Sequence, residues 1–402
     1  MVQEQLLEKI KSFTAPDDLK NAGVYPYFRP IEENHDTEVQ IGGKKVLMFG
    51  SNSYMGLTNH PEVLKAAKDA IERFGSSCSG SRFLNGTSSV HIELEKELAT
   101  YLGKESALTF TTGFQTNLGA VSALTGRNGV IFLDELDHAS IIEGARLSFS
   151  KVLKYAHNDM RDLEQKLKTV AEDRIKMIVV DGIFSMEGDI CNLPEIVRLA
   201  KQYKSLVMVD DAHSLGVLGE EGKGTADHFG LTNEVDLIVG TFSKSLASLG
   251  GYVAGNKNII NFIKHNARPM IFSASTPPSV AAAALAALKI IKREPERLKA
   301  LWDNTNYMVN ALNELGFDMG HSKSPIIPIY IRDNFLTFQF TQRLFEEGVF
   351  VNPVVSPAVK SDSSLIRMSI MATHTKEQLN MALEKIVLVA NELNVQRHAS
   401  VA

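Results

Sequence analysis

The sequence predicts an α/β protein with a large domain built on a mainly parallel sheet and a smaller α+β domain at the C-terminal end. Three observations lead to this prediction. Between residues 106 and 254, short aliphatic runs alternate with segments of helical periodicity, which is the pattern of parallel strands covered by helices on both faces. After Pro277-Pro278 the expected strands become fewer. The 402 residues are also enough for two domains.

The expected strands are short runs of aliphatic and β-branched residues that end in turn or polar residues. In the large domain they are Lys45 to Phe49, Ala107 to Thr111, Val130 to Leu133, Val152 to Tyr155, Met177 to Phe184, Leu206 to Val209, Val235 to Val239 and Tyr252 to Ala254. The last of these is expected to be antiparallel or to lie at an edge. In the small domain they are Ile326 to Ile331, Val349 to Val351 and Leu365 to Met371.

Helices are expected where apolar residues recur at helical spacing, and some have a start signal such as Asp159 or Pro194. They are Pro61 to Phe74, His91 to Leu102, a helix opening at Gly113, Ser140 to Leu147, Met160 to Val170, Leu193 to Tyr203, Ala281 to Arg293, Pro295 to Leu315 and Thr375 to Leu393. We therefore predict an N-terminal helix and arm at residues 1–45, a large domain at 46–293 and a small domain at 294–402.

The composition argues against several classes of function. A net charge of −5 without a basic stripe gives no electrostatic case for nucleic-acid binding. The two cysteines, Cys78 and Cys191, are too few for a disulfide framework, which is typical of a reducing compartment. The apolar stretch from Pro278 to Ile291 is shorter than the ~20 residues that a membrane span needs. We expect a cytoplasmic protein in which this stretch is a buried helix.

Polar residues cluster where the expected strands end. Ligands of α/β sheets bind at the carboxyl ends of the strands. The residues concerned are Asn52, Thr112, Gly113, Phe114, Asp137, His138, Ser185, Asp210, His213, Thr241, Phe242, Ser243 and Lys244, together with Arg367 from the small domain. Each alone has a structural alternative, such as a helix cap, an ion pair, a core histidine or a surface lysine. Their coincidence at one edge is therefore the better evidence.

Three of these residues together fit pyridoxal phosphate. Lys244 follows a strand, and an amine presented by a rigid strand end can act as a Schiff-base nucleophile. Asp210 ends the run SLVMVD, where a carboxylate can keep the ring nitrogen of the cofactor protonated, which makes the ring an electron sink. His213, three residues further on, can hydrogen-bond the phenolic oxygen.

Other strand-end residues suit the rest of that cofactor and its substrate. A helix start offers free N–H groups and a positive dipole end for a phosphate, and hydroxyl groups can add donors. The residues in these two roles are Gly113, Phe114, Thr241 and Ser243. His138 could stack on the ring, and Ser185 could also reach it. The planar guanidinium of Arg367 suits a substrate carboxylate.

Motifs of other enzyme classes are absent from the sequence. There is no GxGxxG after a strand, no GxSxG elbow and no His/Cys cluster with zinc spacing. The run GEEGKGT at Gly219 to Thr225 lacks the spacing of a P-loop.

Over nearly the whole chain, from about Tyr25 to Leu393, the sequence resembles the α-oxoamine synthases, which are fold-type-I pyridoxal-phosphate enzymes. The segments VMVDDAHSLGVLG, GTFSKS and LxFTTGFQTN carry this resemblance. Members of the family condense an amino acid with an acyl-CoA and release carbon dioxide. The resemblance therefore implies the fold-type-I transferase fold, pyridoxal 5′-phosphate as cofactor and an acyltransferase activity.

The resemblance also implies a role for each matching residue. Lys244 is the Schiff-base lysine that removes the α proton, His138 stacks on the ring and Asp210 pairs with the ring nitrogen. The other implied cofactor contacts are His213 and Ser185 near the phenolic oxygen, and Gly113, Phe114, Thr241 and Ser243 at the phosphate. Ser273 and Ala274 would reach the phosphate of the other subunit's cofactor, which implies a homodimer with shared active sites. Arg367 would bind the substrate carboxylate, with Asn52 close to it.

Within the family, TFSKS and the proline-containing segment NPVVSPAVKSDSSLIR resemble the serine palmitoyltransferase branch, which uses L-serine and palmitoyl-CoA. That branch typically carries PPAxP where this chain has SPAV. The alternative is a glycine C-acetyltransferase, which uses glycine and acetyl-CoA on the same fold. A non-catalytic subunit of this fold is a further alternative, against which the presence of Lys244, Asp210 and His138 counts. Peripheral contact with a membrane is a further possibility for an enzyme of lipid synthesis.

Overall fold

A seven-stranded sheet forms the centre of the large domain in this computed structural model, which describes residues 2–397. The strands in spatial order are β4 (Ser106–Phe110), β10 (Gly251–Gly255), β9 (Leu237–Thr241), β8 (Leu206–Asp210), β7 (Ile175–Asp181), β5 (Gly129–Asp134) and β6 (Lys151–Tyr155). Strand β10 runs opposite to the other six strands, as predicted, but lies inside the sheet between β4 and β9 rather than at an edge. The remaining pairs, from β9 to β6, are parallel, which confirms the predicted, mainly parallel sheet.

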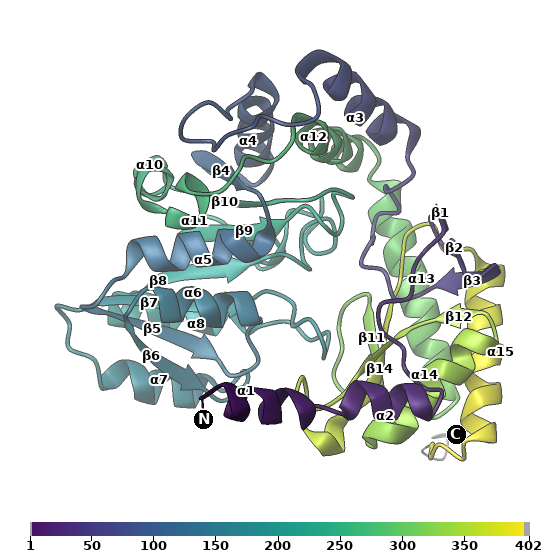
Figure 1. Cartoon of the computed structure of the whole chain (residues 1–402). Coiled ribbons are helices and arrows are strands. Elements are labelled where there is room, and N and C mark those ends of the chain that lie inside the picture. The colour runs from purple at the N-terminus through teal and green to yellow at the C-terminus, as the bar shows by residue number, and fades with distance from the viewer. Residues whose placement is uncertain (1, 398–402) are drawn as a thin grey trace.

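Helices cover both faces of this sheet because successive residues of each strand point to opposite sides (Figure 1). On one face, Ile131, Val179 and Val239 pack with α5 (Gly113–Leu124), α6 (Ala139–Leu147), α10 (Lys257–Asn266) and α11 (Arg268–Ile271). On the other face, Phe132 and Val180 pack in a cluster that includes α3 (Pro61–Phe74), α4 (Ser89–Tyr101), α7 (Met160–Lys168), α8 (Leu193–Tyr203) and α12 (Pro278–Arg293). A short helix, α9 (Thr225–His228), follows β8.

The alanine-rich stretch forms α12, and most of its side chains are buried against α3 and α4, as expected for a core helix. Within residues 2–397, no helix combines the length and the apolar character that crossing a membrane requires.

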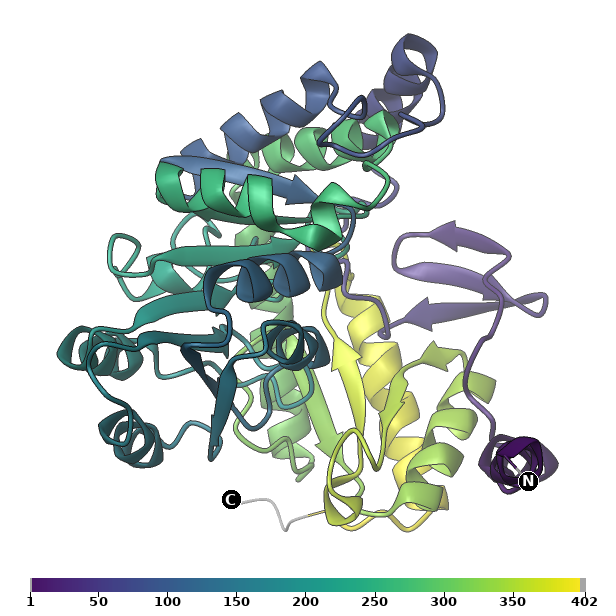
Figure 2. The same ribbon diagram turned by 60° about the vertical axis from the view of Figure 1, so that its left-hand side comes forward.

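The C-terminal part supplies three helices and strands of two small sheets, one of which it shares with the N-terminal segment (Figure 2). One sheet has the order β11 (Ile326–Tyr330), β14 (Leu365–Ser369), β13 (Asn352–Val354). The other joins β1 (Glu33–His35), β2 (Glu38–Ile41) and β3 (Lys44–Met48) to β12 (Val349–Phe350). The helices are α13 (Glu296–Glu314), α14 (Asn334–Glu346) and α15 (Lys376–Glu392), and η1 (Ser361–Ser363) is a single 3₁₀ turn.

The N-terminal segment is richer in structure than the predicted single helix and loop. It contains α1 (Val2–Lys11), α2 (Ala15–Asn21) and the β1–β2 hairpin. The hairpin was missed because its first strand is only three residues long and wholly exposed, so it has no buried face to give an alternating pattern. The expected arm packs on α14, where Tyr27 contacts Phe338 and the Arg29 guanidinium lies over the Phe345 ring. The domain boundaries at residues 45 and 293 stay a prediction.

Candidate active site

The carboxyl ends of the central strands meet at a cavity of about 250 Å³. Convergence follows from the topology, because strands that run parallel end at the same edge of the sheet. Ten of the predicted site residues line the cavity: Thr112, Gly113, Phe114, His138, Ser185, Asp210, His213, Thr241, Ser243 and Lys244.

Lys244 follows β9 and shares the cavity with Asp210, the last residue of β8. Burial lowers the pKa of Lys244 to about 8, although the carboxylates of Asp210 and Asp181 act in the opposite direction, and the Arg367 cation lowers it further. About a tenth of the lysine is therefore the uncharged amine at pH 7, far more than at its usual pKa, and a nucleophile or a general base requires this form.

The carboxylate of Asp210 is held in one orientation. Its Oδ1 accepts a hydrogen bond from the N–H of Ala212 at 2.9 Å, and its Oδ2 accepts one from Nδ2 of Asn117 at 2.6 Å. Asp210 is only 5% exposed. A buried, fixed anion of this kind suits a cationic group such as a protonated ring nitrogen.

The two predicted histidines occupy different environments. His138 is the N-cap of α6, its backbone N–H donates to Oδ2 of Asp181 at 2.8 Å, and the residue lines the cavity. His213 is buried, and its Nδ1 lies 2.7 Å from the hydroxyl of Tyr54. Burial lowers the pKa of His213 well below its usual value, and the Lys244 and Arg367 cations add to this effect. His213 is therefore a neutral imidazole at neutral pH.

The start of α5 forms an anion cradle. Thr112 caps the helix by accepting a hydrogen bond from the N–H of Gln115 at 3.1 Å. In the described part of the chain, nothing accepts from the N–H groups of Gly113 and Phe114, which line the cavity. Thr241 and Ser243 stand opposite, with their hydroxyl oxygens 2.9 Å apart. Free N–H groups at the positive end of a helix dipole suit a phosphate group.

Arg367 lies beside the cavity rather than in its lining. It is the central residue of β14 (Leu365–Ser369), inside the strand that the sequence predicted from Leu365 to Met371. Its Nε donates to the carbonyl oxygen of Ser185 at 2.5 Å and its Nη1 to Oδ1 of Asn52 at 3.0 Å. The predicted pair of Arg367 and Asn52 is therefore in contact, and Ser185 connects Arg367 to the cavity.

Ser273 and Ala274 lie outside the cavity lining, next to the start of α5 of their own chain. Nε2 of Gln115 donates to the hydroxyl of Ser273 at 3.1 Å, and the hydroxyl of Thr111 donates to the carbonyl oxygen of Ala274 at 2.7 Å. Their contact with a second subunit stays a prediction.

Three cavity residues with polar side chains were not predicted from the sequence: Asn117, Ser140 and Asp181. Asn117 lies one turn after Gly113 on α5, and Ser140 is two residues after His138, so helical spacing could have indicated both. Asp181 ends β7, and the same strand-end argument that selected Asp210 applies to it. Strand β7 was predicted to run on to Phe184, which directed attention to Ser185 instead.

Behind the cavity, His157 joins two carboxylates. Its Nδ1 is 2.9 Å from Oδ1 of Asp134 and its Nε2 is 2.9 Å from Oδ2 of Asp189. Although burial acts against protonation, these two hydrogen-bonded carboxylates raise the pKa of His157 to about 10. The charged imidazolium therefore offsets part of the negative charge of the buried acids that support the loop before His138.

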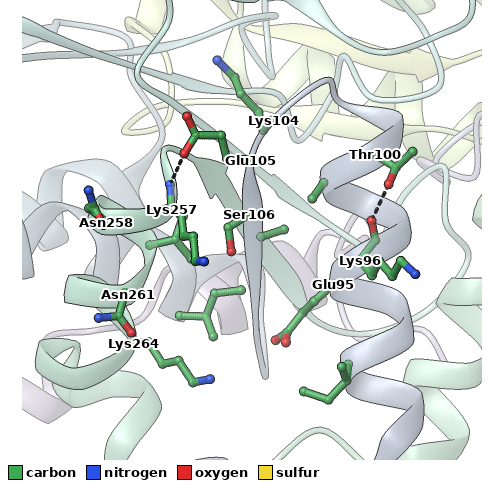
Figure 3. A pocket seen from close by; sticks show the side chains of 15 residues that line it. Glu95, Lys96, Thr100, Lys104, Glu105, Ser106, Lys257, Asn258, Asn261 and Lys264 are labelled. Atoms are coloured by element: carbon green, nitrogen blue, oxygen red, sulfur yellow. Dashed lines mark hydrogen bonds between the residues drawn. The ribbon is translucent and has the colours of Figure 1, made fainter.

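A second and larger space of about 650 Å³ is separate from this site. It lies beside the edge strand β4, between α4 and α10, and Figure 3 shows its lysines, Lys96, Lys104, Lys257 and Lys264. None of the predicted site residues lines it.

The donor set of the cavity matches pyridoxal phosphate. The unpaired N–H groups of Gly113 and Phe114 suit the phosphate, the buried carboxylate of Asp210 suits the pyridinium nitrogen, and the amine of Lys244 suits the aldehyde carbon. A side chain at position 113 would also fill the cradle, because its Cβ would lie 2.8 Å from Cβ of Thr241.

Comparisons with known proteins agree with this arrangement. The family described as "Aminotransferase class I and II" matches residues 44–386. The serine palmitoyltransferase of Sphingobacterium spiritivorum is 58% identical, over 98% of this chain and 99% of its own, and that of Bacteroides thetaiotaomicron is 55% identical, over 97% and 99%. A solved structure of "SPT with PLP internal aldimine" superposes with a TM-score of 0.95 at 35% identity, covering 97% of this chain and 100% of the other.

The seven-stranded sheet, the cavity at its carboxyl edge and these matches lead to one conclusion. The chain belongs to the aminotransferase class I and II family and has its fold-type-I transferase fold, and within that family it is an α-oxoamine synthase.

Proposed function

We propose that this protein condenses L-serine with palmitoyl-CoA to give 3-ketodihydrosphingosine, CoA and carbon dioxide. This is the serine palmitoyltransferase reaction, the first step of sphingolipid synthesis, with pyridoxal phosphate as cofactor. The observation that carries the proposal is the convergence of Lys244, Asp210, His138 and His213 on one cavity. The choice of serine and palmitoyl-CoA is supported by relatives of that name that are 55–58% identical over nearly the full length.

We assign the residues that would hold pyridoxal phosphate as follows. The phosphate would lie at the N–H groups of Gly113 and Phe114 and the hydroxyls of Thr241 and Ser243. The ring nitrogen would face Asp210, the phenolic oxygen would face His213 and Ser185, one ring face would lie on His138, and the aldehyde would meet Lys244. When bound, the cofactor delocalises the electron pair that forms on the α carbon of the amino acid.

The side chains of the protein bind the amino acid and move its proton. The guanidinium of Arg367, with Asn52 beside it, would bind the serine carboxylate. Lys244 would take the α proton, for which an amine with a pKa of about 8 is suited. The α carbon then forms a bond to the acyl carbon, the C–S bond of the thioester breaks and CoA leaves. Loss of carbon dioxide breaks the bond between the α carbon and the carboxylate, and a proton takes the place of the carboxylate on that carbon.

The proposal extends to assembly and location. Ser273 and Ala274 would contact the phosphate bound by a second subunit, so the working unit would be a cytoplasmic homodimer with shared active sites. Mixed dimers test this point, because a Ser273 variant should impair the site of the other subunit. Peripheral contact with a membrane is a prediction that co-sedimentation with phospholipid vesicles tests.

A substrate matrix tests the proposed reaction. Purified holoenzyme is given serine or glycine, each with palmitoyl-CoA or acetyl-CoA, and CoA release is measured. We expect the highest kcat/KM with serine and palmitoyl-CoA, and no release by Lys244→Ala. Preference for glycine with acetyl-CoA would overturn the proposal in favour of glycine C-acetyltransferase.

A further inference from the structure

We propose that Asn117 and Ser140 are positioning residues that hold His138 in the tautomer with its proton on Nε2 and link it to the carboxylate of Asp210. This inference rests on the proposed function, because His138 is assigned there to the face of the cofactor.

Two donors meet at Nδ1 of His138. The backbone N–H of Ser140 is 3.3 Å from this nitrogen, and the hydroxyl oxygen of Ser140 is 2.7 Å from it. A backbone N–H can only donate a hydrogen bond, so Nδ1 has to be the accepting nitrogen and carries no proton. In a neutral imidazole the proton is then on Nε2, and the second ring nitrogen becomes a donor.

Asn117 determines which way the serine hydroxyl points. Its Nδ2 lies 2.6 Å from Oδ2 of Asp210 and 2.8 Å from the hydroxyl oxygen of Ser140. An ionised carboxylate only accepts hydrogen bonds, so the NH₂ side of the amide faces Asp210. The second amide hydrogen is then donated to Ser140, whose own hydrogen turns to His138. The amide of Asn117 thus connects the carboxylate of Asp210, through Ser140, to the imidazole of His138.

The side chains of this network are buried, and its hydrogen-bond donors are the groups that matter for His138. Asn117 is 2% exposed and Ser140 is 1% exposed. The side-chain oxygen of Asn117 is also buried and, among residues 2–397, has no hydrogen-bond partner. An unsatisfied buried oxygen is destabilising, and an apolar side chain would avoid it. What Asn117 supplies and an apolar side chain would not is the pair of hydrogen bonds that its NH₂ group donates.

The charged groups around His138 fit a neutral ring. Burial lowers its pKa, Asp210 opposes this, and Lys244 adds to it. Asp181 accepts from the backbone N–H of His138, and His213 is close enough to interact electrostatically with the ring. Two donors at Nδ1 further oppose protonation, because both nitrogens of an imidazolium must donate. His138 can then offer one N–H, from Nε2, to the amino acid in the cavity.

The tautomer can be observed directly. Holoenzyme labelled with ¹⁵N-histidine is studied by NMR, and His138→Gln identifies the signals of position 138. We expect an unprotonated Nδ1 and a protonated Nε2. A proton on Nδ1 would overturn the proposal. This measurement needs no turnover, so it gives its answer even if serine and palmitoyl-CoA prove not to be the substrates.

Variants test the link to the reaction. Ser140→Ala should lower kcat/KM for serine about tenfold, the effect of losing one hydrogen bond to a buried group, and should move the acid limb of its pH profile to higher pH. Asn117→Ala should act in the same direction, and Ser140→Thr should restore the profile. The matched control is Ser148→Ala, a buried serine at the other end of α6 whose hydroxyl donates to Ala145. Equal pH profiles for Ser140→Ala, Ser148→Ala and the wild type would refute the positioning role.

Discussion

The cradle at the start of α5 makes a quantitative prediction for Gly113→Ala. A Cβ on Gly113 would lie 2.8 Å from Cβ and 2.9 Å from Oγ1 of Thr241, whereas ordinary contact begins near 3.4 Å. Thr241 is the last residue of β9, and its hydroxyl donates to the carbonyl oxygen of Gly250 at 2.9 Å, so the strand resists displacement. The helix start must therefore move, and the free N–H groups move with it.

Overpacking of this kind costs about 1–3 kcal/mol. If the displaced helix start weakens the binding free energy of pyridoxal phosphate by this amount, its Kd should rise about 5- to 150-fold. The assay is a titration of cofactor-free protein with pyridoxal phosphate, followed by absorbance, together with a measurement of Tm.

Gly119→Ala is the matched control, because it makes the same change in the same helix. Its Cβ would lie 2.6 Å from Cε1 of Phe110, in the core below the helix and away from the cradle. We expect it to lower Tm at least as much as Gly113→Ala while leaving the cofactor Kd close to that of the wild type. Wild-type affinity in Gly113→Ala, or equal loss in both variants, would show that the cradle is not the phosphate site.

Three other predictions concern single side chains. Lys244→Ala should abolish turnover and the absorbance of the lysine-bound cofactor, and spectra with a CoA-release assay check this; undiminished turnover would contradict the assignment. Arg367→Ala should raise KM for serine far more than KM for acyl-CoA in steady-state kinetics, and equal effects would argue against the carboxylate role. His157→Gln should lower Tm most below pH 6.5, because the raised pKa of His157, about 10, stabilises the folded state there, and this contribution is lost as pH rises towards 10. A Tm difference between His157→Gln and wild type that grows with pH would reverse the sign of that argument.

Most of the central sheet could be predicted from the sequence because its strands are buried on both faces. Such strands appear as continuous apolar runs, and the runs that became β7, β8 and β9 end at or near a functional residue. The alternation of strands and helices then implied parallel neighbours, and parallel neighbours imply one shared edge. The prediction that Asp210 and Lys244 would meet therefore needed only local patterns and a topological rule.

The elements that the sequence did not reveal depend on contacts between distant segments. The β1–β2 hairpin is held through its pairing with β3, and β3 pairs in parallel with β12, some 300 residues later in the chain. Within the hairpin only the four residues of β2 alternate between polar and apolar, and this short alternation does not show which strand they pair with.

The sequence alone was enough to name the chemistry, because residue types and the ends of apolar runs can both be seen in it. They indicated an amine, an acid and two imidazoles at the edge of a parallel sheet. Folding decided how those groups behave. The pKa of Lys244, the neutrality of His213 and the bonds that Asn117 makes to Asp210 and Ser140 all arise from burial and from neighbours on other elements. Desolvation and hydrogen-bond direction are properties of a three-dimensional environment, so they exist only once the chain has assembled it.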